Sequence, residues 1–70
     1  MKKNKPKLLS LIIPVYKQEK TVGKNLRYIL SELSFLPFDY EIIVVVDGFL
    51  DRSFEEAKKI QSPHLIVVGY

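Results

Sequence analysis

Cysteine is absent from this 70-residue chain, and histidine occurs once, as His64. The absence of cysteine excludes disulfide frameworks, thiol nucleophiles and cysteine-ligated zinc, and a single histidine leaves little for any other zinc site. Glycine occurs three times, at Gly23, Gly48 and Gly69. This spacing fits neither the G-x-G-x-x-G dinucleotide motif nor the G-x-x-x-x-G-K-[ST] phosphate loop. Both of those nucleotide-binding classes are therefore excluded.

Long apolar runs are also missing. Nowhere do 18 apolar residues stand together, so this stretch of chain is not expected to span a membrane. The basic start followed by apolar residues 8–16 resembles a secretory signal, but Pro14 interrupts the run and Lys17 follows it at once. We therefore expect a cytoplasmic location.

The charge of the chain is unevenly distributed. The formal net charge is +3, but four of the 11 basic residues are lysines within residues 1–7. The rest of the chain has 7 basic and 8 acidic residues. Residues 1–7 are thus predicted to be a solvated basic tail, which has no interleaved aromatic side chains for nucleic-acid binding. The chain is 47% hydrophobic and 27% charged, a composition typical of a folded protein. Residues 8–70 are therefore predicted to form one small domain or part of a larger one.

Hydrophobic periodicity predicts a strand followed by a helix. Residues 8–13 form a short apolar run that predicts a strand, and Pro14 should end its pairing at Ile13 because proline has no N–H to donate. From Val22 the apolar residues recur at helical spacing, with Thr21 as the expected cap and Pro37 beyond the end. The apolar positions of this helix are Val22, Leu26, Ile29, Leu30 and Leu33.

The segment 41–46 contains five consecutive β-branched residues, which predicts a strand covered on both faces, as in parallel sheets. Residues 47–52 should form a loop, and Ser53 with Glu56 reads as a capping box that opens a helix through Ile60. Residues 65–68 predict a third strand. The order β-α-β-α-β indicates an α/β fold with a parallel sheet, half of a doubly wound domain.

Ligands of such sheets bind beyond the carboxyl ends of the strands, which here are the loops 14–19 and 47–52. Asp47 directly follows the central strand. A carboxylate at this place would repel phosphate but would accept hydrogen bonds from a pyrimidine N3–H, a guanine N1–H or ribose hydroxyls. The alternative is that Asp47 only organises a turn with Gly48.

Two segments carry a resemblance to a known family. The sequence L-I-I-P-V-Y-K-Q-E at 11–19 and the sequence Y-E-I-I-V-V-V-D-G-F-L-D-R-S at 40–53 are similar to the amino-terminal motifs of family 2 glycosyltransferases. The match runs from residue 10 to residue 68. The resemblance implies half of a three-layer GT-A (Rossmann-like) domain, truncated before the D-x-D motif.

The resemblance also implies a nucleotide-binding site. By that likeness Pro14, Tyr16 and the acidic position at Gln18 or Glu19 contact the nucleobase and ribose, while Val45 and Asp47 line the opposite side. Three positions depart from the family pattern: Gln18 stands where relatives often have Glu, Val46 replaces the first of two paired aspartates, and Lys17 replaces the usual Asn. Asp51 matches the family's second loop aspartate, for which we favour a role in the loop and helix cap.

The implied function is that of a glycosyltransferase, with this chain carrying the nucleoside-binding half and inactive alone. The donor would be a UDP-, GDP- or dTDP-sugar, and the divalent metal (Mg²⁺ or Mn²⁺) expected for the full-length family would be held by residues outside this chain. No catalytic or metal-binding residue is predicted here. The alternative is a non-catalytic half-domain that assembles with another polypeptide. In either case the expected protein partners are a second copy or a missing carboxyl-terminal half, and membrane association of a full-length parent stays open.

Overall fold

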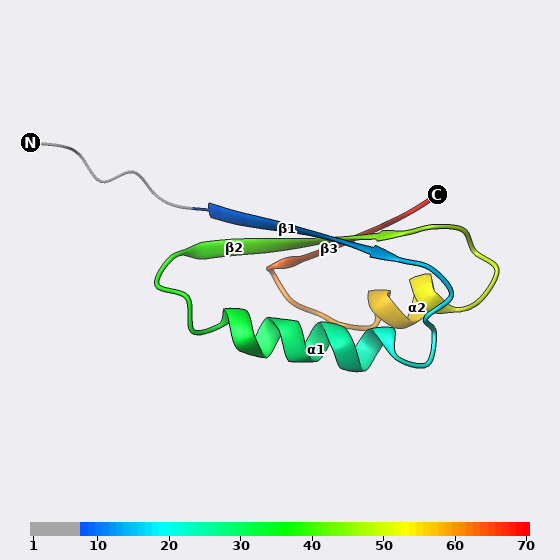
Figure 1. The fold of residues 1–70 in the computed structure, drawn as a ribbon, viewed down its shortest axis with the longest axis horizontal. Coiled ribbons are helices and arrows are strands. Elements are labelled where there is room, and N and C mark those ends of the chain that lie inside the picture. Colours follow the sequence, from blue (N-terminus) through cyan, green and yellow to red (C-terminus); the bar gives the residue numbers. More distant parts are fainter. Residues whose placement is uncertain (1–7) are drawn as a thin grey trace, which may run out of the picture.

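Three strands and two helices alternate along residues 8–70, the part of the chain that the computed structural model describes (Figure 1). The predicted order β-α-β-α-β is confirmed, and the predicted basic tail lies outside the described residues. The elements are β1 (Leu8–Val15), α1 (Val22–Leu33), β2 (Asp39–Val46), α2 (Ser53–Lys58) and β3 (Leu65–Gly69).

The three strands form one parallel sheet in the order β1-β2-β3, as predicted. Leu8 pairs with Asp39 at one end of β1 and Val15 pairs with Val46 at the other, while β3 pairs with β2 from Ile42 onward. β2 is therefore the central strand, with a neighbour on each side.

Pro14 lies within β1, so the prediction that strand pairing stops at Ile13 is wrong. β1 is an edge strand of the described sheet, and its residues alternate between the β2 side and the free side. The Val15 carbonyl accepts a hydrogen bond from Asp47 on the β2 side, which places the backbone nitrogen of Pro14 on the free side. An edge strand tolerates proline at such a position because no ladder hydrogen bond is lost.

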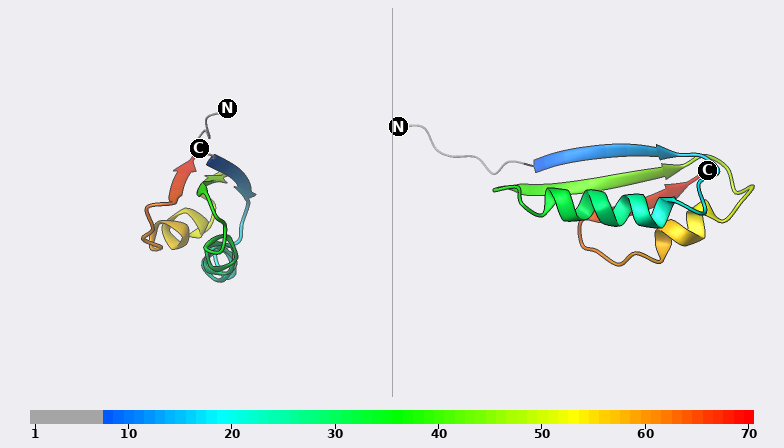
Figure 2. Two further views of the ribbon diagram at one scale, coloured as in Figure 1. Left: turned by 90° about the vertical axis from the view of Figure 1, so that its left-hand side faces the viewer. Right: turned by 60° about the horizontal axis from the view of Figure 1, so that its bottom comes forward.

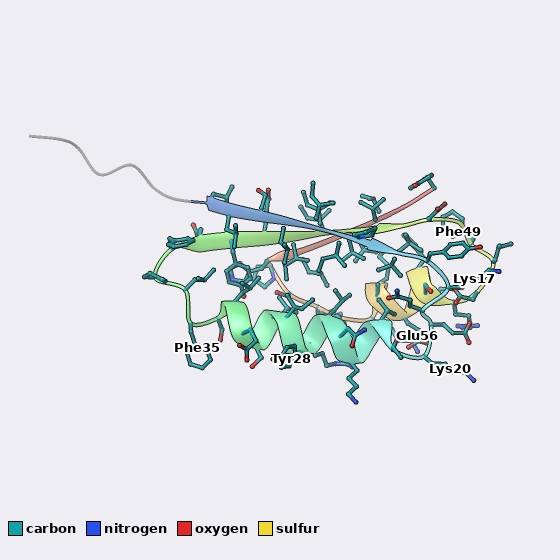
Figure 3. The ribbon with its side chains drawn as sticks, in the orientation of Figure 1. Lys17, Lys20, Tyr28, Phe35, Phe49 and Glu56 are labelled. Carbon is teal, nitrogen blue, oxygen red and sulfur yellow. The ribbon has the colours of Figure 1, made fainter. Side chains whose placement is uncertain are left out.

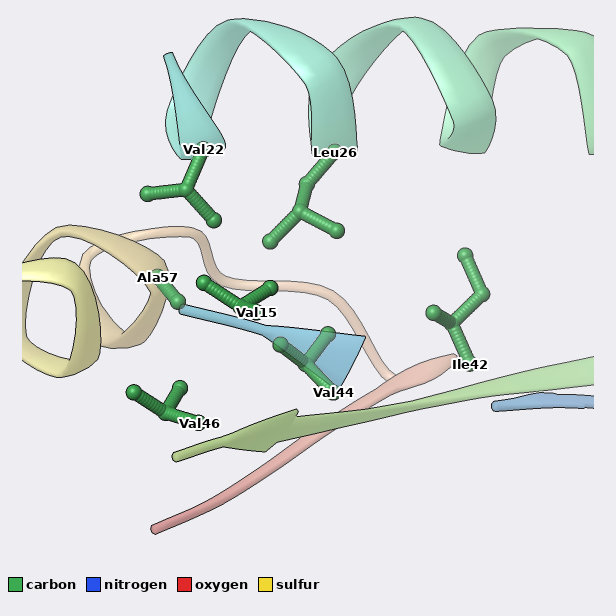
Figure 4. Packing of buried hydrophobic residues seen from close by; sticks show 7 residues of the cluster. All are labelled: Val15, Val22, Leu26, Ile42, Val44, Val46 and Ala57. Atoms are coloured by element: carbon green, nitrogen blue, oxygen red, sulfur yellow. The ribbon is translucent and has the colours of Figure 1, made fainter. Parts of the chain in front are cut away.

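Both helices cover the same face of the sheet (Figures 1 and 2). The chain steps across the sheet twice in the same direction, and two crossovers of the same hand carry both helices onto one side. Between the layers lies a core to which β1, β2 and both helices contribute (Figure 4). Its buried hydrophobic members are Val15, Val22, Leu26, Ile42, Val44, Val46 and Ala57.

The opposite face of the sheet is uncovered within residues 8–70, and it is apolar except for the hydrogen-bonded pair Ser10 and Glu41 near one end. Ile12 is 64% exposed, and Ile66 and Val68 are nearly half exposed, while Ile43 and Val45 are half-buried through their place in the central strand. The expectation that β2 is covered on both faces is therefore met on one face only. The described residues supply two layers of the three-layer architecture, the sheet and one helical layer.

The helix caps and the end of α2 differ from the sequence predictions. α1 begins at Val22 as expected, but Thr21 makes no side-chain capping hydrogen bond. The predicted capping box at Ser53 is wrong, because Ser53 is already the first residue of α2 and its hydroxyl bonds elsewhere. α2 also ends at Lys58, so the expected apolar position Ile60 falls beyond the helix, where it still packs against the core.

Candidate functional site

The two loops singled out from the sequence leave the sheet side by side. Pro14 pairs with Val45 across β1 and β2, and the N–H of Asp47 donates to the carbonyl of Val15 at 2.8 Å. Tyr16 follows Val15 and Asp47 follows Val46. Both residues therefore lie directly beyond the paired carboxyl ends of β1 and β2. In Figure 3, Lys17 and Phe49, one from each loop, lie at this same end of the molecule.

Asp47 offers an unengaged carboxylate. Its side chain is exposed and accepts no hydrogen bond from any residue of the described part of the chain. The turn that follows is held by the backbone, since Gly48 has φ of +85° and its N–H donates to the carbonyl of Tyr70 at 2.7 Å. The side chain of Asp47 takes no part in that turn and is free to accept hydrogen bonds from a ligand.

Tyr16 is 54% exposed and lies directly beyond the last residue of β1. The ammonium group of Lys17 lies 5.3 Å from the centroid of the Tyr16 ring, within the range of a cation–π contact. Lys17 has φ of +49°, a left-handed conformation that lysine seldom adopts. The resemblance places Asn at this position, and Asn is among the residues that tolerate this backbone conformation.

Reciprocal hydrogen bonds tie the two loops together beyond the strand ends. The carboxylate of Asp51 accepts the Glu19 N–H at 3.2 Å and the Ser53 N–H at 2.9 Å. In return, the Glu19 carboxylate accepts the Arg52 N–H at 2.9 Å. The fully buried Ser53 hydroxyl accepts the Gln18 N–H at 2.6 Å. Asp51 therefore holds the loop and the start of α2, the role favoured for it from the sequence.

Hydrogen bonding also sets the charge state of Asp51. The hydrogen bond from the Ser53 side chain lowers the pKa of the Asp51 carboxyl, and the N–H groups of Ser53 and Glu19 and the charge of Lys17 act in the same direction. Burial acts in the opposite direction and is outweighed. Asp51 is thus ionised at neutral pH, as a carboxylate that accepts several N–H groups should be.

Gln18 has an exposed side chain and lines a cavity of about 330 Å³ between β1 and α1. Pro14 and Asn25 also line it, whereas Tyr16 and Asp47 do not. The cavity therefore lies along the free side of β1.

Phe49 packs on α2 through Phe54. Its ring meets that of Phe54 edge to face, with the centroids 5.3 Å apart. Both rings lie over Gly69, where an added Cβ would come within 2.8 Å of each. Gly69 is a structural requirement that sequence analysis missed, because the two aromatic side chains that demand it lie 20 and 15 positions before it, beyond the range of a local pattern.

His64 lies away from these loops, at the opposite end of the sheet. Its ring stacks on Tyr40 with centroids 4.0 Å apart, and its Nδ1 lies 2.9 Å from the Tyr40 carbonyl oxygen. The side chain is half-buried. A structural role in joining β3 to β2 accounts for these contacts.

No three of the His, Cys, Asp and Glu side chains in residues 8–70 are grouped closely enough to hold a metal ion. Neither of the two helices in the same range has the length and apolar character needed to cross a bilayer.

Comparison with known proteins identifies the family. A family model described as glycosyl transferase family 2 matches residues 10–68. The chain is 35% identical over 63 residues to an undecaprenyl-phosphate 4-deoxy-4-formamido-L-arabinose transferase of Proteus mirabilis, covering 86% of this chain and 19% of that protein. A protein of the same name from Pseudomonas fluorescens is 36% identical over 64 residues, with the same coverage.

A dodecaprenyl-phosphate galacturonate synthase of Rhizobium johnstonii is 31% identical over 51 residues, covering 73% of this chain and 15% of that protein. The chain thus spans about a fifth or less of the length of these relatives. No solved structure matches the chain significantly. With the family model covering nearly all of the described sheet and both motif loops, the chain belongs to glycosyl transferase family 2.

Proposed function

We propose that this chain supplies the nucleoside-binding portion of a glycosyltransferase that uses a nucleotide-diphosphate sugar as donor. The observation that carries the proposal is the unengaged carboxylate of Asp47 at the end of β2, next to the backbone that leads to Tyr16. Glu19 and Asp51 are the other two carboxylates of these loops, and both already accept backbone N–H groups. Asp47 is therefore the carboxylate available to a ligand.

The chemistry of this carboxylate favours the nucleoside end of the donor. Asp47 would accept hydrogen bonds from a base N–H or from ribose hydroxyls, and it would repel the diphosphate. The exposed ring of Tyr16 offers an apolar surface with a polar tip to the base or the sugar edge. Pro14 and Val45, paired on the adjoining strands, would form the floor of the site.

The diphosphate of the donor needs positive charge nearby. The residues of the proposed nucleoside site, Pro14, Tyr16, Val45 and Asp47, do not supply it. The family resemblance implies a divalent metal, but the described carboxylates do not form a ligand set for one. No step of this proposal depends on a metal held by residues 8–70. The ligands of the divalent metal, and the residues that contact the sugar and the acceptor, are expected elsewhere in a longer protein.

The acceptor class is proposed from the relatives. Each of the three relatives is named for a polyprenyl phosphate, and we extend this acceptor to the protein to which the chain contributes. In a single displacement, a phosphate oxygen of the lipid would form the new bond to the anomeric carbon while the bond to the nucleoside diphosphate breaks. A phosphate oxygen is already ionised near neutral pH, so this acceptor needs a general base less than a hydroxyl acceptor does.

Titration of UDP, GDP and dTDP against the ¹⁵N-labelled chain by NMR tests the nucleoside site. We expect one of them to shift the resonances of residues 14–19 and 45–48 and to leave α1 beyond Asn25 unchanged. The variant D47N should bind more weakly, and the matched substitution E32Q, at an exposed position on α1, should have no effect. Shifts scattered over the surface, or none at all, would overturn the proposal.

We also propose that the 70-residue chain has no transferase turnover by itself. Incubation with several sugar nucleotides, Mn²⁺ and a polyprenyl phosphate should release no nucleoside diphosphate above background. Release that depends on the chain and is abolished by D47N would contradict this.

A second candidate is a non-catalytic half-domain that assembles with another polypeptide. The uncovered apolar face of the sheet favours it, because Ile12, Ile66 and Val68 expose surface that a solitary domain seldom leaves in water. The two candidates differ in the titration above. A half-domain that only assembles with a partner would bind no nucleoside diphosphate, with or without that partner.

A further inference from the structure

We infer that Glu19 and Asp51 act as a pair of positioning residues that hold Tyr16 and Asp47 in place, and that Glu19 acts through the loops and does not contact the nucleoside. The inference rests on the proposed function for the ligand that Tyr16 and Asp47 receive. It assigns Glu19 a different role from the one that the family resemblance implies.

The first support is the reciprocity of the contacts. The Asp51 carboxylate accepts the N–H of Glu19, and the Glu19 carboxylate accepts the N–H of Arg52, the residue next to Asp51. Each carboxylate therefore fixes the backbone that carries the other. We call these two contacts, together with the Ser53 hydroxyl that accepts the Gln18 N–H, the loop clasp.

The second support is the place of the loop clasp in the fold. The loops are joined at their base by the hydrogen bond from Asp47 to Val15, and they are joined again at their far side by the loop clasp. Tyr16 lies three positions before Glu19, and Asp47 lies four positions before Asp51. Both site residues are thus held between two fixed points, which restricts the loops without any contact to Tyr16 or Asp47 themselves.

The third support is the use of the carboxylate oxygens. Glu19 uses one oxygen, Oε1, which a glutamine could replace, since its amide also presents a carbonyl acceptor. Asp51 uses both oxygens, Oδ2 for Glu19 and Oδ1 for Ser53, and an asparagine can accept only one of these N–H groups. The two conservative variants should therefore behave differently.

Amide hydrogen exchange of the ligand-free chain tests the loop clasp. In E19A, the amide of residue 19 should exchange about 10-fold faster although its acceptor Asp51 is intact, because the two contacts form as a unit. In D51N, the Arg52 amide should accelerate similarly although Glu19 is intact. E19Q and the control E32Q should exchange like the wild type.

The amide of Val44 in the central strand reports global unfolding in every variant and separates local opening from loss of the fold. If D51N does not fold, E19A decides, because it removes a single hydrogen bond. The absence of the two cross effects would overturn the inference, whether or not the chain binds a nucleotide.

Nucleoside diphosphate titration gives the functional readout. With the best binder of UDP, GDP and dTDP, affinity should fall several-fold in E19A and D51N and stay unchanged in E19Q and E32Q. If E19Q binds as weakly as E19A while its loop amides exchange normally, Glu19 contacts the ligand directly and the inference is wrong. If the wild type binds none of the three, the proposed function fails for this chain, and the exchange experiment alone decides the loop clasp.

Discussion

Asp47 donates its N–H to the carbonyl of Val15 at 2.8 Å, one residue beyond the paired ends of β1 and β2. This hydrogen bond continues the parallel ladder into the loops. As a result Tyr16 and Asp47, 31 positions apart in the sequence, leave the sheet as neighbours. The geometry places a free carboxylate and an exposed aromatic ring at one rim, where ligands of parallel α/β sheets bind.

The substitution K17N should stabilise the chain by about 0.5–1 kcal/mol. Lys17 has φ of +49°, and asparagine adopts this left-handed conformation at lower cost. Urea unfolding followed by circular dichroism measures the change. K20N, at a nearby exposed lysine without a positive φ, is the control. Equal midpoints for the two variants would show that the backbone at Lys17 is not strained.

The substitution G48A should destabilise the chain by about 1 kcal/mol. Gly48 has φ of +85°, and no other atom lies within 4 Å of the place of an added Cβ, so the cost is one of backbone conformation. G23A should have the opposite effect, because Gly23 lies in α1 and its added Cβ meets only the end of the flexible Arg27 side chain. A thermal melt of each variant compares them, and a stable G48A would contradict the turn geometry.

Leu26 is the largest fully buried side chain, and L26A should cost about 3 kcal/mol through lost burial and a cavity. A domain of this size has little stability to lose, so we expect L26A to unfold without a cooperative transition. I12A, on the uncovered face of the sheet, removes a side chain that is 64% exposed and should change the midpoint little at concentrations where the chain is monomeric. Similar losses in both variants would mean that the uncovered face is packed against something in solution.

Stability should fall as the solution is acidified below about pH 5, and Asp51 should contribute to the fall. Its carboxyl has a pKa below the ordinary value of 3.8 in the folded chain, because of the hydrogen bond from the Ser53 side chain. The folded state therefore binds fewer protons than the unfolded state in this range. The stabilisation is present above the unfolded pKa and is lost as the pH falls through the folded pKa.

Urea midpoints measured from pH 7 to pH 2.5 test the contribution of Asp51. D51N should show a shallower acid dependence than the wild type. Glu56, whose pKa is lowered by its hydrogen bond from Lys59, should leave a residual slope that E56Q removes. An acid dependence unchanged by D51N would contradict the role of its charge.

The uncovered sheet face should drive self-association. The double substitution I66K/V68K places two charges on that face and should yield a monomer at concentrations where the wild type associates. Sedimentation equilibrium at several concentrations measures the difference. V67K is the contrasting variant for the other face of the sheet. Val67 packs against the core on the helical side, so a lysine at this position should unfold the chain. A monomeric wild type with cooperative melting would refute the half-domain interpretation.

Sequence periodicity alone determined the order of the five elements, the parallel sheet and the two loops at its rim. The individual elements depend on neighbours within a few positions: the β-branched run of β2, the helical spacing from Val22, and the break at Pro37. The parallel pairing then follows from their β-α-β-α-β order. The family motifs pointed to Tyr16 and Asp47, and the fold brought their backbones together.

Only the tertiary structure decided which loop side chains are engaged. The bonds from Gln18 to Ser53, from Glu19 to Asp51 and from Arg52 to Glu19 join residues 35, 32 and 33 positions apart, so no local pattern reveals them. A local rule instead assigned Ser53 to a capping box, because it counts only the neighbours along the chain. The placement of both helices on one face likewise follows from the direction of successive crossovers, a property of the assembled sheet.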